Sequence, residues 1–300
     1  MMSGASENLE QIQRLTRHVH VLAGLIGVRH DSRPSTIAAA VGMIEREWAA
    51  MGQAVETQRY DTPAGVAKNL VVEWPGATRP EEIVVVGAHY DTVRTTPGAD
   101  DNASAVAVLL ETTRALAGRR FARTVRFVAF ANEEPPHFIS PTMGSRVYAK
   151  RCRAAQDQII CMVCLEMMGY FVDVPGSQAY PAELPAILRK VLPDRGDFLA
   201  CVSDRATRRP LKRFARAFRK ASPLKLVAHA IPEAQNLLWV SDHGPFWDER
   251  YPALMLTDTS YFRNPHYHEV TDTPETLDYP AMSRATDGVV AGVAALAGEE

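Results

Sequence analysis

The stretch IVVVGAHYD at residues 83–91 is a short apolar run that ends in a histidine and an aspartate. Short, nearly unbroken apolar runs are typical of strands buried on both faces, as in a parallel sheet covered by helices. Three more short apolar runs are each followed by acidic residues or a histidine. The run 125–130 precedes Glu133-Glu134, the run 159–165 precedes Glu166, and the run 253–256 precedes a loop that reaches His268. The sequence therefore predicts an α/β fold, a three-layer α/β/α arrangement around a mixed, mostly parallel twisted sheet.

The polar residues that follow these runs predict a metal site. Open sheets of this kind bind ligands beyond the carboxyl ends of their strands, which is where all of these residues fall. The stretch PGADDNAS at 97–104 adds the paired Asp100-Asp101 in a loop that contains a glycine. Nitrogen and oxygen ligands of this type suit zinc.

Length and composition bound the class of protein. The chain has 300 residues, of which 46% are hydrophobic, and a formal net charge of −2. We expect a single catalytic domain over residues 1–300, with a rim insertion at about 171–197, where prolines and glycines interrupt the pattern. The balanced charge and the lack of an aromatic and basic repeat argue against a nucleic-acid partner.

No apolar stretch is long enough to cross a membrane. Arg14 and Arg17 precede the apolar run 19–28, which raises a signal peptide as an alternative, but the helical spacing of Leu9, Ile12 and Leu15 favours an amphipathic helix. The four cysteines are interpreted as buried free thiols, because Cys161 and Cys164 point to opposite faces of one strand. We expect a cytoplasmic protein.

Further helices are expected at 7–25, 35–51, 103–117, 209–222 and 280–296, and further strands at 54–60 and 69–74. The segment 209–222 carries Leu211, Phe214 and Phe218 at helical spacing, with arginines and lysines on the other face. An anionic docking surface is one interpretation, but a solvated amphipathic helix is favoured.

The requirements of a two-metal site suggest which of these polar residues are ligands and which one is the general base. Two metals a few ångströms apart need one bridging carboxylate and terminal ligands on each side. Five residues satisfy this need, with Asp101 as the bridge. Glu133 is left beside the metals, where a carboxylate that ligates nothing can act as a general base. The five expected ligands are His89, Asp101, Glu134, Glu166 and His268.

Six features occur along the chain in this order: His-x-Asp, Gly-Ala-Asp-Asp, Glu-Glu, an acidic residue after a strand, Ser-Asp-His and Tyr-His-x-x-x-Asp-Thr. Together they resemble the co-catalytic di-zinc aminopeptidases, of the bacterial leucyl aminopeptidase and aminopeptidase Y type. The match covers residues 84–273. The resemblance implies a zinc-exopeptidase, phosphorylase/hydrolase-like fold and two Zn²⁺ ions, with Co²⁺ or Mn²⁺ as alternatives. It implies that His89 and Glu166 bind one metal, and that Glu134 and His268 bind the other.

The same resemblance assigns supporting roles. It implies that Asp91 orients His89 and that Tyr267 donates a hydrogen bond to the developing oxyanion. Ser241-Asp242-His243 resembles the family's support segment, and His243 is favoured as a structural histidine. Asp272 is expected to brace His268 or to cap a turn. The family pattern is altered at Glu166, where aspartate is usual, and at Pro135-Pro136-His137, so side-chain preference does not transfer.

These features predict a zinc aminopeptidase that acts on peptide or dipeptide substrates, with no membrane partner and with an oligomeric state that the sequence leaves open. A single-zinc, glutaminyl-cyclase-like transferase and a non-catalytic binding module are the alternatives. Tyr261, Phe262 and Arg263 are candidates for the pocket lining, and Arg263 keeps carboxypeptidase or dipeptidase activity open. No Gly-x-Ser-x-Gly elbow and no phosphate-binding glycine loop occurs.

Overall fold

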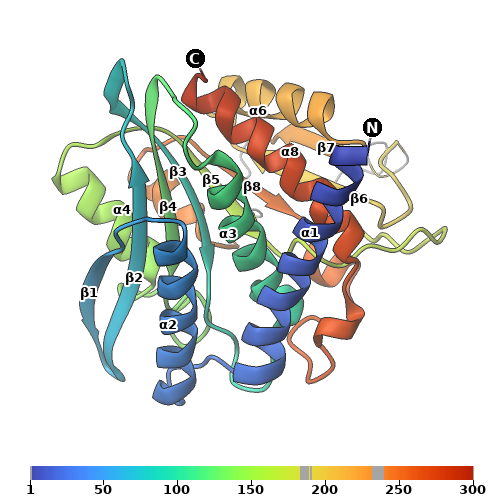
Figure 1. Cartoon of the computed structure of the whole chain (residues 1–300). Helices are drawn as coiled ribbons and strands as arrows, with labels where there is room; N and C mark the ends of the chain where they lie inside the picture. The colour runs from blue at the N-terminus through green and yellow to red at the C-terminus, as the bar shows by residue number, and fades with distance from the viewer. Residues whose placement is uncertain (1, 183–188, 190, 232–239, 300) are drawn as a thin grey trace.

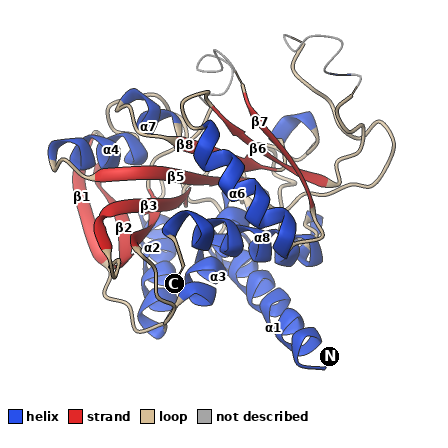
Figure 2. Ribbon diagram, turned by 90° about the horizontal axis from the view of Figure 1, so that it is seen from above, coloured by secondary structure: helices blue, strands red, loops and turns tan. Residues whose placement is uncertain are grey.

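The computed structural model describes residues 2–182, 189, 191–231 and 240–299. Eight strands form one sheet in the order β1-β2-β4-β3-β5-β8-β6-β7, and helices cover both of its faces (Figures 1 and 2). The strands are β1 (Glu56–Thr62), β2 (Gly65–Trp74), β3 (Arg79–His89), β4 (Arg123–Phe130), β5 (Gln158–Glu166), β6 (Phe198–Ser203), β7 (Lys225–Ala230) and β8 (Ala253–Thr257). The predicted three-layer α/β/α fold is confirmed.

The described helices fall into two unequal layers. The longer ones lie on one face of the sheet, and the shorter α4 and α7 lie on the other (Figure 2). Their bounds are α1 (Met2–Val19), η1 (His20–Ile26), α2 (Pro34–Ala50), η2 (Ala99–Ser104), α3 (Ala105–Leu116), α4 (Gly144–Ala154), α6 (Arg208–Ala221), α7 (Gly244–Asp248), η3 (Ser260–Phe262), η4 (Pro274–Thr276) and α8 (Tyr279–Ala297). No described helix is both long enough and apolar enough to pass through a lipid bilayer.

Alternation along the central strands separates two apolar cores. In β3, Val84 and Val86 face the core beneath the larger helical layer, whereas Ile83 and Val85 face α4 and α7. Because successive side chains of a strand point to opposite faces, unbroken apolar runs feed both cores. Cys161 and Cys164 lie in different cores, and all four cysteines are buried and free, which agrees with the interpretation of the cysteines.

The helix boundaries follow local chemistry. Pro34 is the first residue of α2, where its missing N–H costs no hydrogen bond. At the start of α8, the side chain of Asp278 accepts a hydrogen bond from the Ala281 N–H at 2.8 Å. The helix ends at Gly298, whose φ of 73° is the left-handed conformation that glycine adopts readily. These signals explain why the predicted helices agree with the structure to within a few residues.

Strand β6 and the edge strand β7 were not predicted. They pair in parallel with each other, but β6 runs antiparallel to β8, with Ala200 opposite Thr257 and Ser203 opposite Leu254. In β7 the exposed Lys225 and His229 interrupt the apolar pattern. Strand β6 is apolar from Phe198 to Val202, but it directly follows the segment 171–197, where prolines and glycines break the pattern. The carboxyl ends of β6 and β7 therefore lie at the opposite edge of the sheet from those of β3, β4, β5 and β8.

The helix predicted at 209–222 is α6, and it packs on α8. A Cβ atom at Gly288 would lie 2.3 Å from the ring of Phe218, and one at Gly292 would lie 2.4 Å from the ring of Phe214. The two glycines let the phenylalanine rings approach the α8 backbone. This packing buries the apolar side of α6 and turns its basic side to solvent. The expected insertion at 171–197 stays a prediction, and residues 183–188 and 190 within it lie outside the described residues.

A buried carboxylate joins α1 to α3. Glu111 is 1% exposed, and its oxygens accept hydrogen bonds from Arg14 Nε at 2.8 Å and Arg114 Nε at 3.3 Å, with His18 Nε2 at 3.3 Å. Burial disfavours the charged form, but the hydrogen bonds from His18 and Arg14 outweigh it and hold the pKa of Glu111 below its ordinary value.

We expect Glu111→Gln to lower the free energy of unfolding at neutral pH by about 1–3 kcal/mol, because hydrogen bonds to a charged group are lost. A depressed folded-state pKa stabilises the protein above the unfolded pKa of about 4.3, and this contribution is lost as the pH falls through the folded value. Urea unfolding should therefore show a gap between the two proteins that narrows below about pH 4. Glu10→Gln, at an exposed position on α1, is the matched control. A gap that stayed constant with pH would contradict this role.

Candidate metal centre

Parallel strand register brings most of the predicted site residues to one edge of the sheet. His89 ends β3 opposite Phe130, which ends β4, and Glu166 ends β5. Glu133 and Glu134 follow β4 directly, Asp101 lies in η2 before α3, and His268 lies between η3 and η4. All five predicted ligands are therefore brought together.

One group of potential ligands consists of His89, Asp101 and Glu166. The Nε2 atom of His89 lies 3.4 Å from Asp101 Oδ1 and 3.4 Å from Glu166 Oε2. His89 and Asp101 are buried, and Glu166 is half-buried. The donor atoms lie within 4.8 Å of one another, as a shared metal ion requires.

The other group consists of Asp101, Glu134 and His268. His268 Nε2 lies 3.2 Å from Asp101 Oδ2 and 3.5 Å from Glu134 Oε1. Asp101 thus directs Oδ1 to the first group and Oδ2 to the second. A carboxylate shared in this way is the geometry that a bridging ligand needs.

The chemistry of these donors fits metal ions. Asp101 Oδ1, Glu134 Oε1 and His268 Nε2 are buried atoms with no hydrogen-bond partner in the described part of the chain. Burial and the charge of Asp101 raise the pKa of Glu134 to about 7, against the opposing effect of His268. Burial opposes protonation of His268, but the nearby carboxylates of Asp101 and Glu134 raise its pKa to about 10. Unpaired buried donors and crowded carboxylates are what divalent cations bind.

Glu133 lies beside both groups and belongs to neither. Its Oε2 atom is 4.0 Å from His89 Nε2, and the residue is 5% exposed. Burial raises the pKa of Glu133 well above its ordinary value, opposed by the charge of His89 and reinforced by Glu134 and Glu166. A carboxylate so placed can accept and return a proton.

Asp91 has a second contact that the sequence did not indicate. Its Oδ1 atom lies 3.5 Å from His89 Nδ1, the ring nitrogen that it was expected to orient. Its two oxygens also accept hydrogen bonds from the backbone N–H groups of Glu133 and Glu134, each at 3.0 Å. Asp91 therefore fixes the backbone of the Glu133-Glu134 pair.

Tyr267 stacks on the ring of His268, with 3.7 Å between the ring centroids. Burial and the charge of Asp101 raise the pKa of its hydroxyl, so this group stays protonated at neutral pH. Tyr261, which is exposed, lies 4.3 Å from Phe262 and 5.7 Å from Tyr267 between ring centroids. These three rings form an aromatic surface next to His268.

Arg263 is not available as a surface group. It is 7% exposed, and its Nε donates to Gln178 Oε1 at 2.9 Å, while Nη1 donates to the Phe198 carbonyl at 2.8 Å. Its guanidinium also lies over the Phe198 ring, 4.6 Å from the centroid. The Arg263 guanidinium therefore binds and packs against neighbouring parts of the protein. It is not free on the surface to bind a substrate carboxylate, which was the reason for considering carboxypeptidase activity.

Asp272 has neither of its expected roles. Its carboxylate accepts hydrogen bonds from the backbone N–H groups of Asp100 at 2.8 Å and Asp101 at 3.2 Å. It therefore positions the loop that carries the shared ligand. The Ser241 hydroxyl donates to Glu166 Oε2 at 2.5 Å, as expected of a support segment, and His243 packs edge-on against Trp247 at 4.6 Å.

Arg29 is a supporting residue that the sequence did not reveal. It is fully buried, and its guanidinium donates to five backbone carbonyls, two from its own segment and three from the loops around the site. The bonds to Tyr90 and Pro97 are 2.7 Å long, and the bond to Gly98 is 2.9 Å long. Arg29 thereby holds the segments that carry His89 and Asp101.

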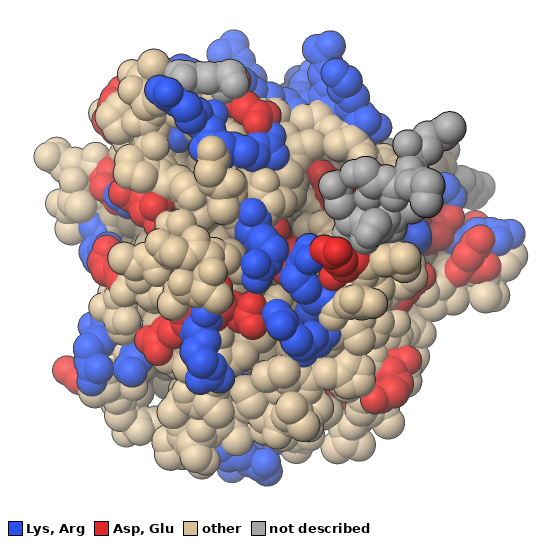
Figure 3. All heavy atoms as spheres, viewed as in Figure 1, with Lys and Arg blue, Asp and Glu red and all other residues tan. Residues whose placement is uncertain are grey.

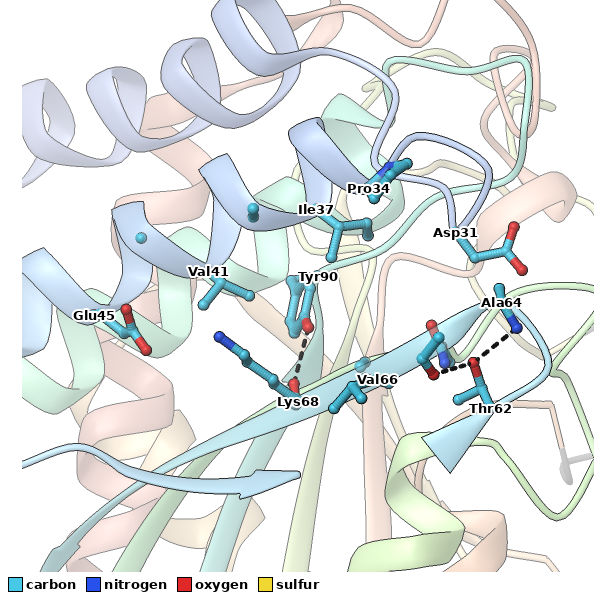
Figure 4. A pocket seen from close by; sticks show the side chains of 16 residues that line it. Asp31, Pro34, Ile37, Val41, Glu45, Thr62, Ala64, Val66, Lys68 and Tyr90 are labelled. Atoms are coloured by element: carbon cyan, nitrogen blue, oxygen red, sulfur yellow. Dashed lines mark hydrogen bonds between the residues drawn. The ribbon is translucent and has the colours of Figure 1, made fainter. Parts of the chain in front are cut away.

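A groove of about 250 Å³ lies between α2 and the β1–β2 hairpin (Figure 4). Ile37 and Val41 of α2 form one wall, and Tyr90 donates a hydrogen bond to the Lys68 carbonyl at 2.8 Å on the other side. None of the predicted site residues is among its described lining residues. The groove is therefore a neighbour of the centre and not part of it.

Comparison with known proteins places this site in a family context. The sequence profile of peptidase family M28 matches residues 69–293. YfbL of Escherichia coli (strain K12) is 34% identical over 93% of this chain and 86% of its own length. A probable leucine aminopeptidase of Trichophyton verrucosum (strain HKI 0517) is 25% identical over 71% of this chain and 53% of its own. The chain spans about half the length of this fungal relative.

Solved structures share the fold. BSAP, a zinc aminopeptidase from Bacillus subtilis, superposes with a TM-score of 0.72 at 15% identity and covers 94% of each chain. The glutaminyl cyclase of Fimbriiglobus ruber superposes with a TM-score of 0.66 at 16% identity and covers 95% of each chain. At such low identity the likeness concerns the fold alone.

Proposed function

Since this chain belongs to peptidase family M28 and is a metallopeptidase, we propose that it is an aminopeptidase with two zinc ions and a glutamate general base. The single observation that carries this proposal is the sharing of Asp101 between two ligand groups. Relatives that are named leucine aminopeptidases support the choice of peptide end.

The residues would divide the work as follows. His89, Asp101 and Glu166 would hold one ion, and Asp101, Glu134 and His268 the other. Zinc ions held there would act as Lewis acids that polarise the scissile carbonyl and make water a better nucleophile at neutral pH.

Glu133 would move the proton. Its Oε2 atom, 4.0 Å from His89 Nε2, would accept a proton from the attacking water and later return it to the leaving amine. The hydrogen bonds from Glu133 N and Glu134 N to Asp91 keep this carboxylate in place. The protonated hydroxyl of Tyr267 would donate a hydrogen bond to the carbonyl oxygen as negative charge develops on it.

Other features support the remaining parts of the proposal. The burial of Arg263 favours amino-terminal over carboxyl-terminal trimming. The exposed ring of Tyr261 beside Tyr267 supports contact with an apolar or aromatic substrate side chain. Four buried free thiols are consistent with our proposal of a cytoplasmic location.

The test is metal content per chain, measured by plasma mass spectrometry on protein purified without chelator and combined with product analysis. A peptide with a free amino terminus, its N-acetylated form and its C-terminally amidated form are incubated in parallel. We expect two metals, and release of the first residue that acetylation blocks and amidation does not. Release from the carboxyl end would indicate a carboxypeptidase. One metal with cyclisation of amino-terminal glutamine would indicate a cyclase, and a chain without metal or turnover would indicate a binding module.

A further inference from the structure

A cationic hollow lies between α6 and the edge strand β7. Its volume is about 450 Å³, and its described lining residues include four basic side chains and no carboxylate. We propose that this hollow, the α6–β7 pocket, binds a small polyphosphate, either inorganic or attached to a nucleoside. The described lining residues are Arg205, Arg208, Leu211, Lys212, Ala228, His229 and Ala230.

The segment of the chain that forms this pocket is strongly basic. Residues 205–231 contain nine lysines and arginines and no aspartate or glutamate, whereas the whole chain has a net charge of −2. The basic side chains of α6 are exposed, because its apolar side packs on α8. Lysine and arginine side chains accordingly project along the top of the molecule, where α6 lies (Figure 3).

The arginines and the lysine of the pocket have no counter-ion among the residues that the structure describes. Within the described residues, Arg205, Arg208 and Lys212 form no ion pair, in contrast to Arg17, which pairs with Glu47. Like charges held around one hollow repel each other, and a bound anion offsets this repulsion. The described lining of the pocket therefore presents three permanent positive charges to a ligand and no carboxylate.

Strand direction separates the pocket from the metal centre. Ser203, the last residue of β6, pairs with Leu254 near the start of β8, whereas Glu166 of the metal centre pairs with Thr257 at its end. The Thr207 hydroxyl, which directly precedes α6, accepts a hydrogen bond from Ala253 N at 3.2 Å. Because α6 begins at the amino end of β8, the pocket lies at the edge of the sheet opposite the catalytic one.

The chemistry of the pocket favours phosphate groups. Arginine presents a planar fork of N–H donors that binds phosphate oxygens in pairs, and two arginines line this pocket. Arg205 and Arg208 lie at the start of α6, where the helix dipole adds positive potential. With Lys212 the pocket has three permanent positive charges, which match a compact ligand with three or more negative charges. Ala228 and Ala230 supply a small apolar wall from β7.

Isothermal titration calorimetry tests this assignment on the full chain, at about 150 mM salt so that diffuse surface attraction is screened. Inorganic tripolyphosphate and ATP are the two probes, and they distinguish a free from a nucleoside-borne source. The pocket variant is Arg205→Gln/Arg208→Gln. The matched control is Arg209→Gln/Arg216→Gln, which removes the same charge from exposed positions of α6 that do not line the pocket.

We expect the pocket variant to weaken binding about a hundredfold and the control to weaken it less than about threefold. Metal content and peptide turnover should be unchanged in both, which separates this proposal from the proposed catalytic function. If the double variant fails to fold, Arg208→Gln alone should weaken binding about tenfold. The absence of binding by both probes would overturn the proposal. So would equal losses in both variants, or equally tight binding of a single-stranded oligonucleotide, since each would indicate attraction by the whole basic face.

Discussion

Glu133→Gln is expected to reduce peptide turnover by about a hundredfold to ten-thousandfold while metal content stays the same. The amide has nearly the shape of the carboxylate but cannot accept the proton from water. Because Glu133 belongs to neither ligand group, its replacement leaves the predicted ligands in place. Steady-state kinetics on a short peptide, with metal analysis on the same preparation, measures both effects.

The neighbouring residue is the matched control for this experiment. Glu134→Gln makes the same chemical change one position along the chain, but it alters a ligand whose Oε1 lies 3.5 Å from His268 Nε2. We expect Glu134→Gln to lose metal as well as activity. If Glu133→Gln kept normal turnover, the general base would have to be another group, and if it lost metal, Glu133 would be a ligand.

Asp101→Asn is expected to weaken both metal sites at once. One oxygen of Asp101 lies 3.4 Å from His89 Nε2, and the other lies 3.2 Å from His268 Nε2. An amide nitrogen cannot act as a ligand in place of the second oxygen, and the negative charge shared by both sites is lost. Metal content should fall from about two ions per chain towards none, and turnover should fall with it.

Substitutions of the predicted ligands that belong to one group only provide the comparison for the metal loss of Asp101→Asn. Glu166→Gln and Glu134→Gln each alter one ligand group, so each is expected to lose about one metal while the other site remains. A chain with Asp101→Asn that still bound two metals would contradict the bridge. Loss of one metal only would assign Asp101 to a single site.

The central sheet could be predicted because its strands are short apolar runs that fill two cores, a pattern visible in a few residues such as 83–86. Strand β7 could not, because the exposed Lys225 and His229 interrupt its apolar pattern, and the direction of β6 is set by its pairing with β8. Helices α4 and α7 were also missed. Helix α7 has only five residues, and the buried side of α4 carries Tyr148, Ala149 and Cys152 but no large aliphatic side chains to mark a helical period.

The grouping of these histidines and carboxylates could be predicted because each has a recognisable place in the pattern of strands and loops. Some supporting contacts, such as that of Asp91 with His89, also had a motif in the sequence, but others had no local signal. Asp272 bonds to backbone N–H groups more than a hundred and fifty residues away, a contact that only the folded chain creates. The sequence named Tyr261 and Phe262 as candidates for the pocket lining and Tyr267 as a hydrogen-bond donor, but it gave no sign that these three rings contact one another.

The contacts of Arg29 limit how far the amino-terminal end of the chain can be truncated. The similarity to the peptidase family begins at residue 69, so α1, η1 and α2 all precede the matched region. Yet Arg29 comes from this preceding segment and carries five hydrogen bonds to carbonyls, three of them on the loops between β3 and α3. A fragment trimmed to the conserved boundaries would leave those carbonyls without their donor and open the buried interior beside His89 to water. The amino-terminal helices are thus an integral part of any minimal active fragment.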